Sequence, residues 1–164
     1  MTTTKTTKKT EWQVEKLPPN PFMSEILEVV HKQRSKAKKI EVLKHYRDDA
    51  LTALLIWNFD PSVVSALPDG DVPYKPNDVP EGTEHTRLNQ EYRQLWHYIK
   101  GADAKTPQFR KEQMFVQLLE GLHVDEAKVI CYAKDKVLHQ KYKGLSDNVV
   151  KEAFGWNENY VKAT

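Results

Sequence analysis

The chain has a single cysteine in 164 residues, Cys131, so it can form neither an internal disulfide nor a thiolate cluster for zinc. No apolar run approaches the ~20 residues that a membrane-spanning helix needs. The first ten residues, MTTTKTTKKT, lack the apolar centre of a signal peptide. We therefore expect a protein of a reducing cytoplasm with no membrane segment.

Sequence motifs of catalysis and of metal binding are also missing. There is no glycine-rich phosphate loop and no GxSxG elbow, and no two of the six histidines are four residues apart. Cys131 lies beside Ile130 in an apolar stripe, which is typical of structural burial rather than nucleophilic use. We expect no enzymatic activity, no catalytic residue, no metal site and no cofactor.

The charge is unevenly distributed although the net charge is only +2. Residues 58–86 carry six acids against Lys75 alone. Residues 32–47, which we interpret as a basic helix, carry seven cations against Glu41, and these are the candidate polyanion-binding residues: Lys32, Arg34, Lys36, Lys38, Lys39, Lys44 and Arg47. Several phosphates could be neutralised there, so contact with DNA or RNA is one hypothesis. An ordinary solvated helix face is the alternative.

Helical periodicity dominates the rest of the chain. Apolar stripes with a 3.6-residue period follow capping residues, and no period-two alternation is present. The expected caps are Asn20, Ser35, either Asp48 or Asp49, Asp60, Thr106 and Ser146. The pattern predicts an all-α bundle of six or seven short helices. We expect a flexible Thr/Lys-rich tail at 1–18, one helical domain at 19–157, and a C-terminal tail at 158–164.

Three features of this pattern make specific predictions. Residues 50–59 are apolar on nearly every side, which predicts a buried central helix ended by Asn58 in a left-handed conformation. Residues 86–101 are predicted to form one helix with Trp96 and Ile99 facing inward. The stripe that begins at residue 125 is predicted to break near Asp135.

The stretch KYKGLSDNVVKEAFGW, residues 141–156, has the spacing of the turn and second helix of a DNA-reading helix-turn-helix. However, Gln140 occupies the position where that motif needs a small residue, and Asp147 and Glu152 make the second helix poor for approaching phosphates. We favour the simpler interpretation that Gly144 caps one helix, Ser146 caps the next, and the helices pack together.

An acidic, proline-rich loop is expected at residues 68–86, because four prolines and two glycines there prevent both helix and central strand. Its core, VPYKP, consists of Val72, Pro73, Tyr74, Lys75 and Pro76. One hypothesis is a strap whose Val72, Pro73 and Tyr74 cover the helical core. The other is a docking segment for a partner protein. We favour the strap, since an acidic loop with few large apolar groups offers a partner little area.

Several strings of the sequence resemble one known family: LLIWNFDPSV, LPDGDVPYKPND, PEGTEHTRL, MFVQLLEGLH, AKDKVLHQKYKGL and VKEAFGW. They are similar to an uncharacterised domain of unknown function in small proteins of large contractile-tailed phages, including marine cyanobacterial myoviruses. The resemblance spans roughly residues 20–157 and brings no activity and no catalytic residues. It implies a phage gene product in the cytoplasm of an infected bacterial host.

Three functions therefore remain open at the level of the sequence. The first is a non-enzymatic binding or adaptor protein that acts on a host or phage protein. The second is a nucleic-acid-binding accessory of phage DNA metabolism that uses the basic helix 32–47. The third is a minor component of the virion.

Overall fold

A computed structural model describes residue 17, residues 21–77 and residues 86–161 of the chain. Over these residues the chain is helical: α3 (Met23–Lys32), α4 (Lys36–His45), α5 (Asp49–Phe59), α6 (Leu88–Glu91), the 3₁₀ helix η1 (Tyr92–Tyr98), α7 (Gln108–Gly121), α8 (Val124–Lys134), α9 (Leu138–Lys141) and α10 (Asp147–Phe154). The only β-type pairings among the described residues are two single bridges, Ser65–Ile99 and Thr86–Leu122. The predicted all-α class is thus confirmed. The predicted N-terminal tail, except Leu17, lies outside the described residues, as do 78–85 of the loop and the last three residues.

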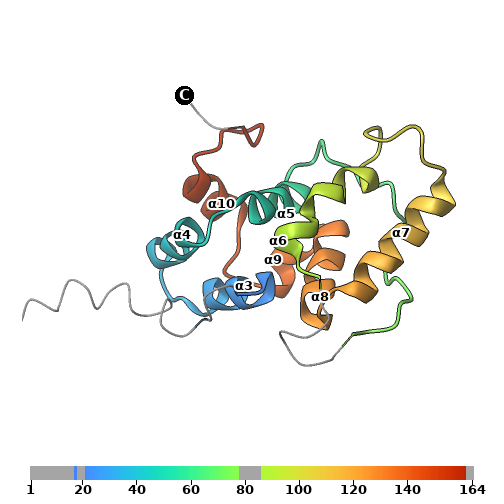
Figure 1. The fold of residues 1–164 in the computed structure, drawn as a ribbon. Coiled ribbons are helices and arrows are strands. Elements are labelled where there is room, and N and C mark those ends of the chain that lie inside the picture. Colours follow the sequence, from blue (N-terminus) through green and yellow to red (C-terminus); the bar gives the residue numbers. More distant parts are fainter. Residues whose placement is uncertain (1–16, 18–20, 78–85, 162–164) are drawn as a thin grey trace, which may run out of the picture.

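Helix α5 lies at the centre of the molecule (Figure 1), as its uniformly apolar sequence predicts. It begins where the Asp48 carboxylate accepts a hydrogen bond from the backbone N–H of Leu51 at 2.8 Å. Leu51, Leu55 and Trp57 are buried, and the helix packs against α8, α6 and η1. None of the helices in the described part of the chain is both long and apolar enough to span a bilayer.

A buried carboxylate on α8 fixes the beginnings of two other helices. Glu126 is only 2 % exposed, and its Oε2 and Oε1 accept hydrogen bonds from the backbone N–H groups of Met23 and Leu88, both at 2.9 Å. These are the first residues of α3 and α6, whose N–H groups have no partner within their own helices. Burial raises the pKa of Glu126, and the two hydrogen bonds oppose that rise.

The predicted left-handed end of α5 at Asn58 is wrong. Asn58 lies within the helix and is buried, and its Oδ1 accepts a hydrogen bond from the backbone N–H of Leu138 at 2.9 Å, where α9 begins. The end of α5 is instead satisfied by Lys136, whose Nζ donates to the carbonyls of Trp57 and Asp60. The predicted break near Asp135 is confirmed, because Asp135 ends α8 and α9 starts at Leu138.

The single helix predicted for residues 86–101 is divided into α6 and the 3₁₀ helix η1. A 3₁₀ helix repeats every three residues, so the inward positions become Leu95 and Tyr98, which are both buried. Trp96, predicted to face inward on a 3.6-residue repeat, is 49 % exposed. Burial also raises the pKa of the Tyr98 hydroxyl to about 12.

The loop between η1 and α7 is organised around the buried Asp103. Its Oδ1 accepts hydrogen bonds from the backbone N–H groups of Lys105 and Thr106, and its Oδ2 lies 2.7 Å from Nδ1 of His97. Hydrogen bonds from His97 and Thr106 hold the pKa of Asp103 below its usual range. Thr106, which the sequence predicts as the cap of α7, is separated from that helix by Pro107, and α7 begins at Gln108.

Helix α10 confirms the packing interpretation of residues 141–156. Ser146 caps it through the backbone N–H of Val149, and its buried face lies mainly against α4. Gly144 does not cap the preceding helix as predicted, because α9 ends at Lys141 with Tyr142 as its C-cap. Nor is Gly144 left-handed, since the glycines with positive φ in the described residues are 70, 101 and 155. Gly144 is needed for close approach instead: a Cβ there would lie 3.1 Å from the carbonyl oxygen of Val30.

The described part of the C-terminal segment folds back on α10. Gly155 ends the helix with φ +69°, and the ring of Trp156 then packs edge-on against Phe154 with centroids 4.7 Å apart. The Tyr160 hydroxyl donates to Asp147 in the first turn of the same helix, and Nζ of Lys151 bridges Asp147 to the residues that follow the helix.

We expect Glu126→Gln to lower the free energy of unfolding by about 1–3 kcal/mol. Glutamine offers one acceptor oxygen where the carboxylate offers two, so either Met23 or Leu88 loses its buried hydrogen-bond partner. Denaturant unfolding measures the change. The matched control is Glu28→Gln on the exposed side of α3, which should stay within about 0.5 kcal/mol of wild type. Equal effects would contradict the double capping role.

A second prediction concerns pH. A carboxyl whose pKa is lower in the folded chain contributes stability above its unfolded pKa of ~3.9, and that contribution is lost as the pH falls below this value. We therefore expect Asp103→Asn to destabilise the protein near pH ~7, and its difference from wild type to shrink between pH ~5 and ~2. Unfolding of both proteins over this range, with the exposed Asp71→Asn as control, tests it; a constant difference would contradict it.

Candidate functional site

The basic segment 32–47, which the nucleic-acid hypothesis treats as one basic helix, consists of the end of α3, a break and the whole of α4. The break agrees with the predicted cap at Ser35. The break follows from Ser35, whose hydroxyl accepts a hydrogen bond from the backbone N–H of Lys38 and so starts a new helix. Lys32 is the last residue of α3, Arg34 lies in the break, and Arg47 follows α4 with its guanidinium over the Phe154 ring. The seven cations therefore do not form one continuous face.

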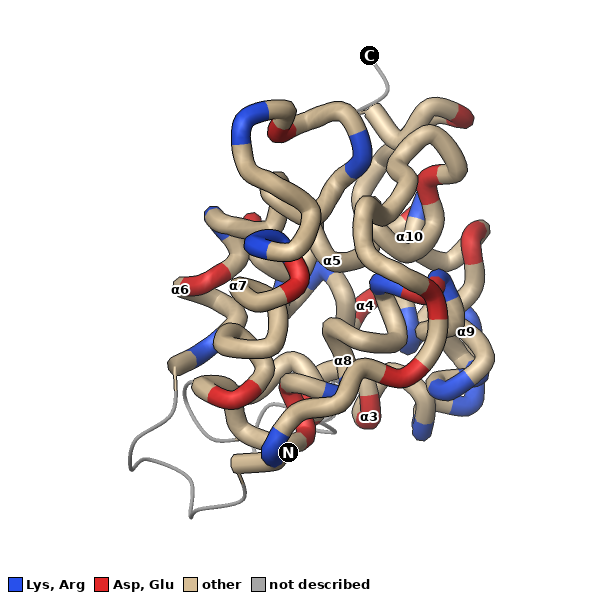
Figure 2. The backbone as a smooth tube through the Cα atoms, turned by 90° about the vertical axis from the view of Figure 1, so that its right-hand side faces the viewer, with Lys and Arg blue, Asp and Glu red and all other residues tan. Residues whose placement is uncertain are grey.

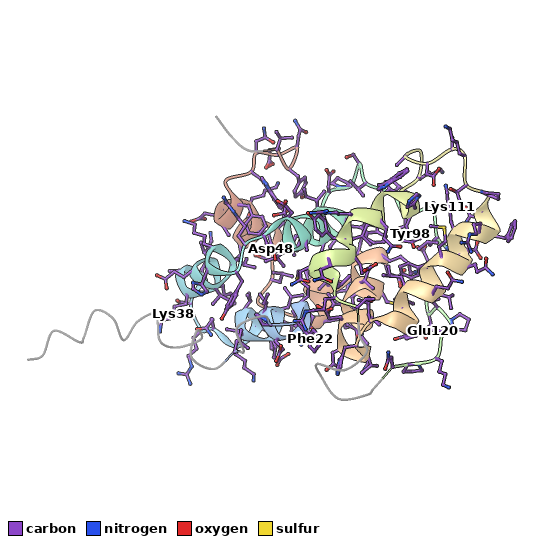
Figure 3. The ribbon with its side chains drawn as sticks, viewed as in Figure 1. Phe22, Lys38, Asp48, Tyr98, Lys111 and Glu120 are labelled. Atoms are coloured by element: carbon purple, nitrogen blue, oxygen red, sulfur yellow. The ribbon has the colours of Figure 1, made fainter. Side chains whose placement is uncertain are left out.

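The cations of α4 lie on two stripes, because residues three apart are neighbours on a helix surface. Lys38, Glu41 and Lys44 form the outer stripe, which is exposed and has an acid at its centre. Figure 3 shows Lys38 at the outer edge of the molecule. Lys36 and Lys39 form the other stripe, and both line a groove next to α10.

Lys39 is partly used for structure. Its Nζ donates to the carbonyl oxygen of Gln33, just after α3, and its aliphatic chain packs beneath Gly144 so closely that a Cβ on that glycine would overlap it. The residue is accordingly half-buried. A lysine that satisfies the carbonyl at a helix end is favourably placed in the field of that helix, whether or not a ligand is present.

The groove beside α10 brings together side chains from three separate segments. It has a volume of about 510 Å³, and its basic walls are His31, Lys36, Lys39 and Lys143. The backbone N–H of Lys143 donates to Nδ1 of His31 at 3.1 Å, which ties the turn after α9 to the end of α3. In Figure 2, Lys and Arg positions gather beside α3, α4 and α9. We call these four side chains and the space between them the basic groove.

Sequence reasoning did not find Lys143 or His31 as members of this site. Lys143 could have been predicted from its position next to Gly144 in residues 141–156, the stretch compared with a helix-turn-helix. Lys36 also faces Glu152 at 3.1 Å, but both side chains are more than half exposed, so this ion pair contributes little. Lys36 is therefore available to a stronger anionic partner.

Residues 68–77, the described part of the proline-rich loop, are tied to the helices along their length. Lys134 has a side chain that is 0 % exposed, and its Nζ donates to the carbonyl oxygens of Pro68 and Gly70. Further along, the backbone N–H of Lys75 donates to the Glu120 carboxylate at 2.8 Å. At the end, Asn77 accepts a hydrogen bond from the backbone N–H of Val124.

The predicted docking residues divide into two groups within this loop. Val72 and Tyr74 are half-buried and pack against the core, and burial raises the pKa of the Tyr74 hydroxyl. Pro73, Lys75 and Pro76 are exposed. The two largest side chains of the VPYKP core thus contact the protein itself, as the strap hypothesis requires of them, while Pro73 does not cover the core.

The described residues hold no cluster of three or more His, Cys, Asp or Glu side chains that could bind a metal ion. Cys131 is a free, half-buried thiol, and burial raises its pKa to about 11. A thiol with a raised pKa is mostly protonated at neutral pH and is a poor nucleophile.

We expect Tyr74→Ala to lower the free energy of unfolding by about 1–3 kcal/mol, less than truncation of a fully buried aromatic, because Tyr74 is half-exposed. Lys75→Ala is the matched control: it removes an exposed side chain and keeps the backbone bond to Glu120, so it should change stability by less than about 0.5 kcal/mol. Chemical denaturation compares them. An unchanged midpoint for Tyr74→Ala would show that this loop is not a strap.

Comparison with known proteins agrees with the resemblance at the level of an uncharacterised domain. No curated protein and no solved structure matches the chain. A protein family of unknown function matches residues 26–140, well over half of the sequence, from within α3 to within α9. Lys143 and α10, which form one wall of the basic groove, follow the matched region. The chain belongs to this family of unknown function, DUF6433.

Proposed function

We propose that this protein is a non-enzymatic, phage-encoded binding protein of the infected bacterial cytoplasm, and that its basic groove contacts the backbone of a nucleic acid. The observation that supports the proposal is the meeting of Lys36, Lys39 and Lys143 with His31 in one groove, although they come from three segments. The phage origin and the host cytoplasm follow from the resemblance of the sequence to proteins of contractile-tailed phages.

The composition of the groove favours phosphates over bases. Besides its basic residues it is lined by Gly144, Ser146, Asn148 and Val149, which offer small polar groups and no ring on which a base could stack. The one ring in the groove is the imidazole of His31, whose Nδ1 accepts a hydrogen bond from the backbone N–H of Lys143. Lysines act on phosphates as point charges and carry little sequence information. The expected interaction is therefore salt-sensitive and indifferent to sequence.

The structure lends less support to the VPYKP segment as a site for a protein partner. Val72 and Tyr74 pack against the core, so most of the apolar surface of this segment is already covered by the protein itself. The backbone N–H of Lys75 is likewise bound to Glu120. The exposed remainder, Pro73, Lys75 and Pro76, presents a small surface without a large apolar side chain. An adaptor role would therefore need a different surface.

The basic groove predicts a specific salt dependence. If Lys36, Lys39 and Lys143 each contact a phosphate, affinity for a duplex should fall about 40-fold between ~50 and ~200 mM salt, from the release of about 0.9 counterion per contact. Replacing two of them, in Lys36→Gln/Lys143→Gln, should reduce the log–log slope by about 2. Fluorescence anisotropy with a labelled DNA duplex and a labelled single strand measures both quantities.

The matched control is Lys38→Gln/Lys44→Gln, which removes the same charge from the outer stripe of α4. This variant should keep the wild-type slope. Equal losses in the two variants would show that net charge, rather than the groove, attracts the nucleic acid. Absence of binding by the wild-type protein even at ~50 mM salt would overturn the proposal.

A further inference from the structure

Large apolar side chains are exposed at the end of the molecule formed by η1, the loop before α7 and the first turn of α7. Trp96 and Val64 are about half exposed, and Phe109 is 72 % exposed. Backbone contacts bring their segments together: the N–H of Lys100 donates to the carbonyl of Val64 at 2.7 Å. The Gln108 side chain likewise joins the start of α7 to the carbonyl of Ala66. We call this the apolar end.

The exposed charges within residues 92–111 are of one sign, and the next residue, Glu112, has its carboxylate bound by the Gln108 side chain. Residues 92–111 contain five Lys and Arg residues against a single acid, Asp103, whose carboxylate is buried. Lys111 is also buried, with its Nζ donating to the carbonyl of Asp103; Figure 3 shows it at the end of α7 that lies near Tyr98. The segment therefore exposes four cations and no acid: Arg93, Lys100, Lys105 and Arg110.

Trp96 is held in place although half of it is exposed. Its ring stacks on that of His97 with centroids 3.8 Å apart, and His97 is fixed by its hydrogen bond to the buried Asp103. Arg93 lies three residues earlier, which places it on the same side of a 3₁₀ helix. An aromatic side chain that is already immobilised loses little conformational entropy on binding, and Trp and Arg are the residues most enriched at interface hot spots.

We infer that the apolar end is a docking surface for a protein partner, one whose own surface presents an apolar pocket bordered by Asp and Glu side chains. The pocket would receive Trp96 or Phe109, and the acids would face the four exposed cations. The surface is distinct from the basic groove, since α4 and α10 lie at one side of the molecule and α7 at the other (Figure 1). The protein would thus join a nucleic acid to a second protein.

A protein fits the apolar end better than a single-stranded nucleic acid does. Bases would need open ring faces, but one face of Trp96 is covered by His97. Val64 is aliphatic and offers no ring for stacking, whereas a protein pocket gains from burying it. The four cations are also spread over η1, the loop before α7 and the first turn of α7.

Photocrosslinking tests the inference on the full chain. Phe109, an aromatic side chain that is 72 % exposed, is replaced by benzoylphenylalanine. The protein is then irradiated in a nuclease-treated lysate of infected cells. The control carries the same group at Gln140, an exposed position on α9. We expect Phe109 to give one protein adduct that the control lacks. The cross-linked peptide of the partner should contain apolar residues flanked by Asp or Glu.

Second-site variants show whether the adduct depends on the proposed surface. Trp96→Ser and the charge reversal Lys100→Glu/Lys105→Glu should each lower its yield about tenfold or more, as expected for hot-spot residues. Trp96→Phe should keep part of the yield. Circular dichroism and thermal unfolding of each variant separate loss of binding from loss of fold. Lys36→Gln/Lys143→Gln should leave the yield unchanged, because these residues belong to the basic groove.

Four outcomes would overturn the inference. They are adducts to nucleic acid in a lysate without nuclease, adducts to a second copy of this chain, equal yields from Phe109 and Gln140, and no adduct above background at Phe109. Each outcome is independent of the salt dependence of nucleic-acid binding, so the apolar end and the basic groove can fail separately.

Discussion

The arrangement of the molecule depends on one buried carboxylate. Glu126 accepts the first N–H of α3 and the first N–H of α6, two helices that are far apart in the sequence. Because α3 begins at this carboxylate, the position of its C-terminal end at Lys32 is fixed. The positions of α4 and of the basic groove, which follow that end, are fixed as well. Because α6 begins there too, the carboxylate also sets where η1 and Trp96 follow, between α5 and α7. Both candidate surfaces therefore share one structural origin.

Several lysine side chains bind carbonyl oxygens at helix ends and in loops. The number of lysines in the sequence therefore overstates how many are available to bind an anion. Lys136 satisfies the end of α5, Lys134 holds the proline-rich loop, and Lys39 satisfies the carbonyl after α3. A buried lysine whose ammonium group binds carbonyl oxygens, as Lys134 does, adds little to the field that an approaching anion meets, whereas Lys39 binds one carbonyl and has two further N–H donors. The cations that remain free to act on a partner are fewer than the composition suggests, and their positions matter more than their number.

Local chemistry predicted much of the fold. Ser35, Asp48 and Ser146 cap helices as expected because an N-cap needs only the next three residues. The 3₁₀ geometry of η1 could not be predicted, since apolar residues at 92 and 95 fit either repeat, and Tyr98 or Ile99 completes it depending on packing. The sequence predicted Lys36 and Lys39 of the basic groove as polyanion-binding residues, but not His31 or Lys143. His31 and Lys143 are 112 residues apart, and no local sequence pattern indicates a contact over such a separation.

The pairing of α4 with α10 has a consequence for the order of events during synthesis. The apolar face of α4, with Ile40, Val42 and Leu43, is covered by a helix that leaves the ribosome last among the described elements. Helix α3 packs against α4 as well, but the contacts of α4 with α10 cannot form until α10 emerges, and contacts of such long sequence separation form late. The nascent chain therefore leaves the part of α4 that α10 will cover exposed to water for most of its translation. Charged residues beside such an apolar face, here the lysines and Glu41 of α4, oppose aggregation.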